Sequence, residues 1–383
     1  MQTRKLYYED AYTRRYEAEV LSCESVKNGW AVELDATAFF PEEGGQEADR
    51  GMLGSVRVLD ARERDGVIVH LTDGPLALGK RVTGQLDWAD RFRKMQTHTG
   101  EHIVSGLIHR KYGYDNVGFH LGEGGCTVDV SGELTREQLD QIEREANACL
   151  WRDLPVTARF PLGYELAKMD YRSKLDIKQD VRIVTVEGVD MCACCAPHVS
   201  STGQIGLIKL LDFMRHRGGV RIWMKAGSDA LEDYRARYGA TAAVSGLLNT
   251  PQEDIAAGTE RLLAQRDELK RELAGLRRQA AQAQAAALEA TEGDLLLFAQ
   301  TDEEGMRILA NAGMEKCGGV CGVFSGQDGA YRFVLSSETV DMRAFIKENG
   351  PALKARGGGQ SRMISGRSTA SRQELEAFFR SAK

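Results

Sequence analysis

Two short segments far apart in the chain carry the residues that most restrict how it can fold. The first is HTGEH at 98–102, and the second is DMCACCAPH at 190–198. On a helix, residues four apart lie on one face with Cβ atoms roughly 5–6 Å apart, so His98 and His102 could bind one metal ion. A thiolate and an imidazole in a tight turn suit Zn²⁺, which accepts both sulfur and nitrogen ligands. The sequence therefore predicts a fold in which the two segments meet around one zinc ion.

The spacing leaves the cysteine ligand open. Cys194 and Cys195 are both spaced to bind together with His198, and Cys192 is a third candidate. The alternative to a metal site is a buried cysteine cluster beside a core histidine. Four protein ligands would make the site resemble closed structural zinc sites, so a catalytic role would need ligand exchange, a fifth position or a nearby water.

The composition is typical of a globular protein of two or three domains. The chain has 383 residues, of which 42% are hydrophobic and 28% charged. No apolar run reaches the roughly 18 residues of a membrane span, and the N-terminus lacks a signal-peptide core, so we expect a cytoplasmic protein without membrane association. In a reducing compartment the cysteine cluster would bind metal or react rather than form disulfides.

Net charge argues against a general nucleic-acid binder but leaves room for a local basic surface. The whole chain carries a net charge of −6, whereas residues 341–383 hold nine Lys/Arg and four Asp/Glu. Such a local basic face could bind RNA phosphates. A solvated surface explains the charge alone equally well.

The pattern of apolar and turn residues predicts a multidomain α+β protein in four parts. Short strands separated by turns predict a small β-barrel at 1–90, and mixed helices and strands predict an α+β domain at 91–240. Thr135 and Gln138 have capping-box spacing for one helix, as do Thr250 and Glu253 for another. Apolar residues every seven positions predict a helical or coiled-coil linker at 241–292, and a small α/β domain follows at 293–383.

The linker pattern has two interpretations. Ile255, Leu262, Leu269, Leu276 and Ala283 recur every seven residues. They favour a spacer or a homodimer formed through the helical or C-terminal region. An ordinary amphipathic helix is the alternative.

The metal-binding segments resemble a known family. A His-x-x-x-His pair followed by Cys-x-x-x-His is similar to the editing domain of alanyl-tRNA synthetase and its free-standing relatives, the AlaX proteins. The family motif ends in CGGTH, where this chain has CCAPH at 194–198. Further similar segments are AFFPEEGGQ at 38–46, VGFHLG at 117–122, TGQIG at 202–206, GVRI at 219–222 and GGGQ at 357–360. In the first of these, Glu43 stands where the family has a glycine. The last resembles the glycine-rich signature of the DHH-associated domain.

The resemblance implies a set of site residues. One Zn²⁺ per chain would be bound by His98, His102, Cys194 and His198. The active site would include Gln46, His120 as a proton donor or hydrogen-bonding group, and Thr37 as the residue that recognises a seryl hydroxyl. We expect Thr37→Val to weaken seryl ester hydrolysis with little loss of fold. The C-terminal domain would bind tRNA through Lys354, Arg356, Gly357, Gly358, Gly359 and Arg362.

The resemblance also implies a function. The expected activity is zinc-dependent deacylation of alanine tRNA mischarged with serine or glycine, without a charging activity, because the synthetase's activation and tRNA-acceptor domains would not fit. The rival is a non-catalytic tRNA-binding protein with structural zinc. A DHH-type phosphoesterase and a zinc peptidase are disfavoured, because neither Asp-His-His nor His-Glu-x-x-His occurs in the sequence.

Overall fold

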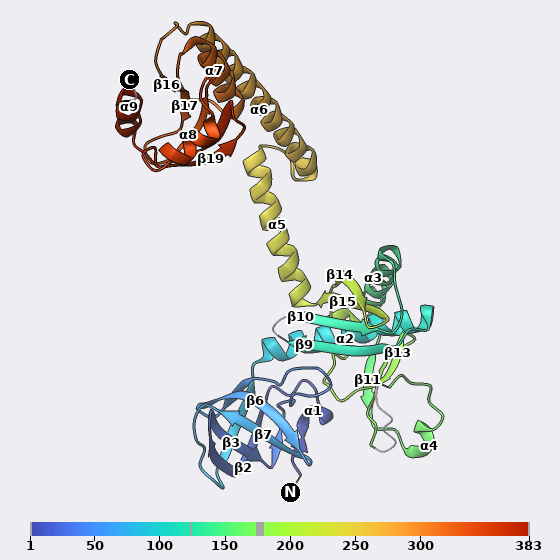
Figure 1. Ribbon diagram of the computed structural model, residues 1–383. Coiled ribbons are helices and arrows are strands. Elements are labelled where there is room, and N and C mark those ends of the chain that lie inside the picture. Colours follow the sequence, from blue (N-terminus) through green and yellow to red (C-terminus); the bar gives the residue numbers. More distant parts are fainter. Residues whose placement is uncertain (1, 123–124, 174–179, 382–383) are drawn as a thin grey trace. The chain divides into compact units, whose positions relative to one another are not determined.

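The computed structural model describes residues 2–122, 125–173 and 180–381. The chain divides into two compact units, 1–240 and 241–383. Both units contain helices and strands (Figure 1), which confirms the predicted α+β class. Among the described residues, no helix is both long enough and apolar enough to cross a membrane.

The first unit begins with a six-stranded antiparallel barrel. Its strands are β2 (Arg15–Val26), β3 (Gly29–Leu34), β5 (Gly51–Leu53), β6 (Val56–Arg64), β7 (Val67–Thr72) and β8 (Arg81–Leu86). They pair in the order β2-β3-β7-β6-β5-β8, and β8 pairs again with β2 to close the ring. Along β2, buried residues alternate with exposed ones, as expected for a strand with one face in a core. The short strands β1 (Arg4–Lys5) and β4 (Ala36–Thr37) pair beside the barrel, next to the single-turn helix α1 (Leu6–Glu9).

A long helix, α2 (Trp88–Tyr112), follows the barrel directly and carries the first of the two segments predicted to bind metal. Asp87 caps its start by accepting from the backbone N–H of Asp90, and Gly113 ends it with φ 70°. The prediction that this helix ends near Gly113 is confirmed. Most of α2 from Met95 to Ile108 is buried, so side chains on several of its faces contact other elements.

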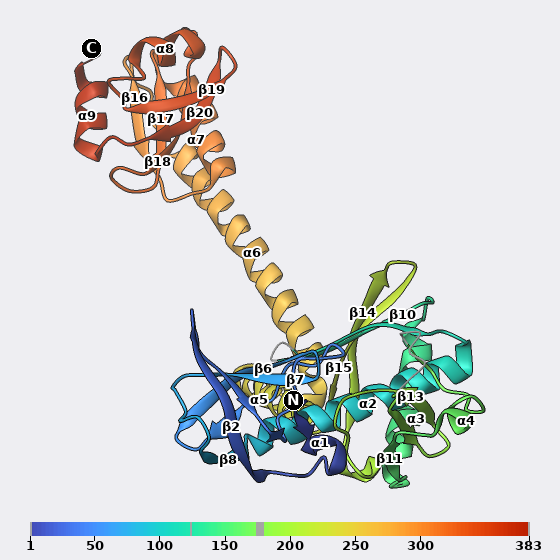
Figure 2. The same ribbon diagram turned by 90° about the horizontal axis from the view of Figure 1, so that it is seen from below.

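Two sheets and a second helix surround α2. One sheet has the order β14-β15-β10-β9 and the other β11-β12-β13. Figure 2 shows α2 with β13 and β15 of these sheets nearby. Their strands are β9 (Asn116–Gly122), β10 (Gly125–Val130), β11 (Val156–Arg159), β12 (Ile183–Val186), β13 (Asp190–Ala193), β14 (Ile208–His216) and β15 (Gly219–Ala226). Helix α3 (Arg136–Trp151) begins with the predicted capping box of Thr135 and Gln138. The short helices α4 (Gly163–Leu166) and η1 (Thr202–Gln204) lie in the connections.

Helices occupy most of the region predicted to be a linker, but the predicted capping box does not form. Helix α5 (Ser228–Leu248) is followed by the 3₁₀ turn η2 (Gln252–Asp254), and α6 (Ile255–Ala286) begins after it without a side-chain cap. The 3₁₀ turn moves the helix start past Glu253, which therefore cannot reach back to Thr250. Leu262, Leu269 and Leu276 are each more than half exposed in the single chain.

The second unit ends in a five-stranded sheet of order β16-β17-β18-β20-β19. The strands are β16 (Leu295–Phe298), β17 (Cys321–Ser325), β18 (Tyr331–Ser336), β19 (Ala355–Gly359) and β20 (Met363–Ser368). Helices α6 and α7 (Glu303–Lys316) pack on one face through Val323 and Val334. Helices α8 (Met342–Asn349) and α9 (Arg372–Ser381) pack on the other face through Phe324 and Phe333.

Candidate metal centre

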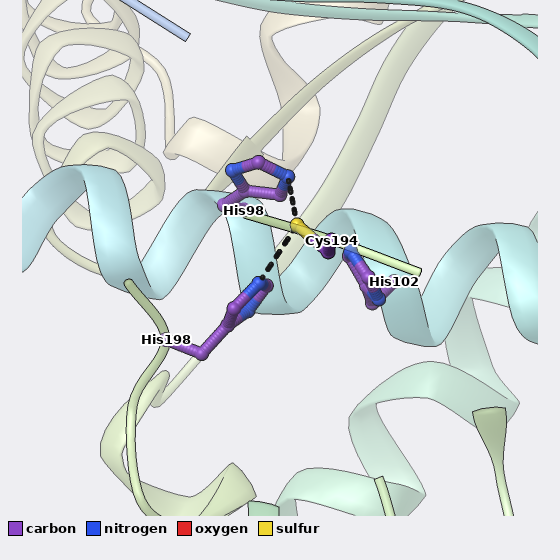
Figure 3. A group of neighbouring side chains, drawn as sticks. All are labelled: His98, His102, Cys194 and His198. Atoms are coloured by element: carbon purple, nitrogen blue, oxygen red, sulfur yellow. Dashed lines mark hydrogen bonds between the residues drawn. The ribbon is translucent and has the colours of Figure 1, made fainter. Parts of the chain in front are cut away.

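The two segments predicted to bind metal meet in the first unit. Helix α2 supplies two histidines, and the turn after β13 supplies a cysteine and a third histidine (Figure 3). These residues, called the metal group below, are His98, His102, Cys194 and His198. One ligand atom from each lies within 4.8 Å of all the others. The Cys194 Sγ is 3.3 Å from Nε2 of His198 and 3.6 Å from Nε2 of His98.

The two sulfur–nitrogen separations fit a tetrahedral zinc site. Zn–N and Zn–S bonds of about 2.0–2.3 Å place neighbouring ligand atoms roughly 3.3–3.7 Å apart. Of the cysteines left open by the spacing, Cys194 is the one grouped with all three histidines. Cys192 groups instead with His102 and Asp190, and among the described residues Cys195 belongs to neither group. The geometry therefore favours Cys194 as the sulfur ligand.

Each imidazole of the metal group is held through its other ring nitrogen. The Nδ1 contacts are His98 to Gln46 Oε1 at 2.8 Å, His102 to Asp190 Oδ2 at 3.1 Å and His198 to Thr99 Oγ1 at 3.0 Å. The Thr99 hydroxyl donates to the carbonyl of Met95 at 2.7 Å, so its oxygen is free to accept from His198. Three acceptors thus place the ring protons on Nδ1 and leave the Nε2 lone pairs for a metal.

The electrostatics of the site favour a thiolate among imidazoles. Burial works to raise the pKa of the Cys194 thiol, but the surrounding histidines, His98 and His198 foremost, outweigh burial and hold that pKa well below its usual value. Burial lowers the pKa of His198 to about 3, which keeps that ring neutral. Thiolate and neutral imidazole are the forms that bind zinc.

Asp190 holds the imidazole ring of His102 in place. Burial opposes ionisation of this carboxyl, but hydrogen bonds from His102 and Arg172 lower its pKa to about 2. Burial also opposes protonation of His102, yet the bond to Asp190 raises the pKa of that ring well above its usual value. Arg172 donates to the second Asp190 oxygen at 2.7 Å and to Ser105. Zinc binding would therefore release a proton from His102.

Gln46 reaches the metal group from a loop between β4 and β5. Gly44 and Gly45 have φ of 61° and 86°, and a Cβ at Gly45 would lie 2.2 Å from the carbonyl oxygen of Phe119. The loop is fixed to β9, because Leu121 donates to the carbonyl of Gly45 at 2.7 Å. Glu43, which replaces a family glycine, is not among the residues with positive φ. The left-handed positions therefore fall on glycines that this chain retains.

Thr37 lies in the interior beside the barrel, and its hydroxyl is fully used. The oxygen accepts from the backbone N–H of Phe39 at 3.1 Å and lies 2.9 Å from the Tyr16 hydroxyl and 2.8 Å from His70 Nε2. The His70 Nδ1 lies 3.2 Å from the carbonyl of Val32, so that nitrogen donates and Nε2 accepts from Thr37. Valine would leave these buried polar groups unpaired, which argues against the expectation that Thr37→Val causes little loss of fold. A role for Thr37 in recognising serine stays a prediction.

His120 faces away from the metal group. Neighbouring residues on a strand point to opposite faces. The Phe119 ring lies beside His98 with ring centroids 4.5 Å apart, whereas His120 is exposed and lines a different cavity with Lys5 and Glu47. A catalytic role for His120 stays a prediction, and its placement does not support direct contact with the metal group.

A cavity of about 350 Å³ opens beside the metal group. Glu101 lines this cavity and is only 3% exposed, and Asn116 donates to its Oε1 at 2.5 Å. Sequence reasoning did not single out Thr99, Asp190 or Asn116. Asp190 and Thr99 lie inside the two predicted segments, so their position in the sequence could have indicated that they lie next to the metal group. Nothing in the sequence indicated Asn116.

The residues predicted to bind tRNA lie on and beside β19 in the second unit. Two of the cations have acidic partners: Lys354 pairs with Glu374 at 2.7 Å, and Arg362 pairs with Glu338. Arg356 is exposed, and the three glycines follow it along β19. A cation that is already paired is a weaker candidate for a phosphate contact.

Comparison with known proteins finds homologues along nearly the whole chain. Residues 181–223 match the family model described as the threonyl and alanyl tRNA synthetase second additional domain. An alanine–tRNA ligase from Halorubrum lacusprofundi is 32% identical over 90% of this chain, and one from Pyrobaculum neutrophilum is 30% identical over 99%. The alanyl-tRNA editing protein AlaX-L from Pyrococcus horikoshii is 34% identical over 55% of this chain.

These matches cover only part of each relative. The chain spans 39% and 44% of the two ligases and 54% of the editing protein. A solved C-Ala domain of Aquifex aeolicus alanyl-tRNA synthetase matches 25% of this chain at 20% identity and a TM-score of 0.21, too low to support a conclusion. The segment that matches the family model contains Cys194 and His198 of the metal group.

Proposed function

This chain is a homologue of alanyl-tRNA synthetases and of an alanyl-tRNA editing protein, and on that basis we propose that it deacylates mischarged alanine tRNA at a zinc ion held by the metal group. The expected substrates are the seryl ester and the glycyl ester. The observation that carries the proposal is the convergence of three Nε2 atoms and one Sγ beside a cavity.

The cavity could hold the aminoacyl end of the substrate. A bound zinc ion would polarise the ester carbonyl or lower the pKa of a water. Glu101 is placed to accept hydrogen bonds from the substrate's ammonium group, because one of its oxygens is bonded to Asn116 and its side chain lines the cavity. Asn116 would orient the carboxylate, and the Phe119 ring would shield His98 from solvent.

The proposal assigns a task to each part of the chain. Residues 1–90 form the barrel that supplies Gln46, and residues 91–240 supply the metal group. Residues 241–292 would act as a helical linker, and residues 293–383 would be a DHH-associated tRNA-binding domain. This division is supported by the boundary between the compact units at 240 and 241.

A non-catalytic tRNA-binding protein with structural zinc is the second candidate. Four protein ligands complete a tetrahedron, which is typical of structural sites. The two functions separate in one assay, in which seryl, glycyl and alanyl esters on alanine tRNA are incubated with protein whose zinc content is measured.

A matched pair of variants sharpens the test. Cys194→Ser should lose zinc and seryl ester hydrolysis, whereas Cys195→Ser, at the adjacent cysteine outside the metal group, should keep both. Zinc-loaded parent protein that binds tRNA and leaves every ester intact would establish the structural alternative.

A further inference from the structure

Three arginines stand in one row across three neighbouring strands of the second unit. The register pairs Arg332 of β18 with Arg367 of β20, and Arg367 with Arg356 of β19. Directly paired residues point to the same face of a sheet, and adjacent strands lie about 4.8 Å apart. All three arginines are exposed. The row is therefore a continuous line of positive charge.

The row lacks internal partners. Within residues 2–122, 125–173 and 180–381, none of the three guanidinium groups takes part in a hydrogen bond or an ion pair. Nearby Lys354 and Arg362 each have a carboxylate partner. Like charges at paired positions destabilise a sheet, so an external anion would relieve a repulsion that the fold leaves in place.

A glycine beside the row keeps the surface open. Gly357 is required by packing, since a Cβ there would lie 2.4 Å from the carbonyl oxygen of Ser365. Gly358 is not required, since a Cβ there would meet no heavy atom within 4 Å. Residues two apart on a strand share a face, so Gly358 lies on the same side of β19 as Arg356.

Gly358 lines a cavity on the surface of the second unit, called the hollow below. Gly358, Gly359, Ser365 and Arg307 line a cavity of about 340 Å³ next to the row. Arg307 comes from α7 and forms an exposed ion pair with Glu303 at 2.7 Å. Strand β19 is at the edge of the sheet, so the hollow is bordered by backbone that no further strand covers.

We propose that the row and its hollow are the surface on which the second unit binds the sugar-phosphate backbone of tRNA. The inference rests on the proposed function, which supplies an RNA substrate. Guanidinium groups donate two parallel hydrogen bonds to a phosphate, and strands about 4.8 Å apart let three of them follow one RNA backbone. The absence of a side chain at Gly358 lets that backbone approach the sheet.

The salt dependence of tRNA binding tests the row. The full chain and a variant with Arg332, Arg356 and Arg367 all changed to Gln are titrated with uncharged tRNA at several salt concentrations. Each lost phosphate contact should reduce the slope of log K against log salt by roughly 0.7–0.9, so the variant's slope should fall by about 2–3. The control changes Arg343, Arg372 and Arg380 to Gln, which removes the same charge from α8 and α9 on the opposite face.

A substitution in the hollow tests the second half of the inference. Gly358→Asp adds a carboxylate where no atom would clash, so the fold should remain and tRNA binding should weaken about tenfold, a change of roughly 1.4 kcal/mol. Gly358→Ala is the neutral control and should bind nearly as well as the parent.

The outcomes separate this inference from the proposed function. The proposal that the arginine row binds tRNA would be contradicted by an equal loss of slope in the row variant and the control. Unchanged tRNA binding by the row variant and by Gly358→Asp would contradict it as well. A row variant that keeps tRNA binding but no longer self-associates in sedimentation would also overturn it, in favour of a protein partner. Hydrolysis of a seryl ester of adenosine, which lacks the tRNA body, tests the metal centre independently of the row.

Discussion

Replacing Thr99 by valine tests whether the hydrogen bonds behind the metal group prepare it for zinc. The hydroxyl accepts from His198 Nδ1 at 3.0 Å and from the backbone N–H of Val199 at 3.3 Å. Valine keeps the shape but leaves both buried donors unpaired, which should destabilise the metal-free protein by about 2–4 kcal/mol. Without its acceptor, His198 can move its proton to Nε2, so zinc affinity should fall about 10–100-fold, or roughly 1.4–2.7 kcal/mol.

The neighbouring residue Thr97 provides a matched control. It lies on the same helix and is 1% exposed, and its hydroxyl has no hydrogen-bond partner in the part of the chain that the structure describes. Thr97→Val should therefore leave zinc affinity unchanged and alter stability by less than about 1 kcal/mol, with a gain expected. Urea unfolding of metal-free protein and zinc competition with a chelator measure the two quantities. Parent-like zinc affinity in Thr99→Val would refute the reasoning, as would equal losses in both variants.

Three further predictions concern buried polar groups of the first unit. Thr37→Val should lower the free energy of unfolding by about 2–4 kcal/mol in urea, because Phe39 N–H and His70 Nε2 lose their partner; a fully stable variant would contradict this. Burial lowers the pKa of His70 to about 4, so the unfolded chain binds a proton between pH 6.5 and 4 that the folded chain does not. Parent stability should thus fall on acidification through that window by about 3 kcal/mol more than that of His70→Gln, measured by urea unfolding. Glu101→Gln should raise KM for a seryl ester about tenfold but spare its N-acetyl derivative, which lacks the ammonium; equal effects on both esters would indicate a different role.

Sequence spacing was informative where local geometry is fixed. Residues four apart on a helix share a face, so the histidine pair of α2 could be predicted without a structure. The turn after β13 carried residue types that suit zinc, but the spacing left Cys194 and Cys195 open. Only the folded structure separates them, because it groups Cys194 with all three histidines.

Other features depend on contacts that spacing does not determine. Alternation along β9 requires Phe119 and His120 to face opposite sides but does not say which side contains the metal group. Arg332 and Arg367 are far apart in sequence, and their adjacency follows from the register of β18 and β20. The paired state of Lys354 depends on Glu374, which lies on another element. The composition of residues 341–383 predicted a basic region. Ion pairs with nearby carboxylates decide which of its cationic side chains are available to bind an anion.

The barrel is part of the metal centre rather than a separate attachment. Gln46 belongs to the loop between β4 and β5, yet its Oε1 accepts from His98 on α2. Arg91, also on α2 and fully buried, pairs with Asp49 of the same loop, and Lys94 donates to the carbonyl of Ala48 at 2.7 Å. Loop and helix are therefore joined by buried charged groups just after the glutamine in the loop. Because a displaced loop would leave the buried Arg91 without its carboxylate partner, the orientation of the His98 ring depends on the barrel being folded against α2.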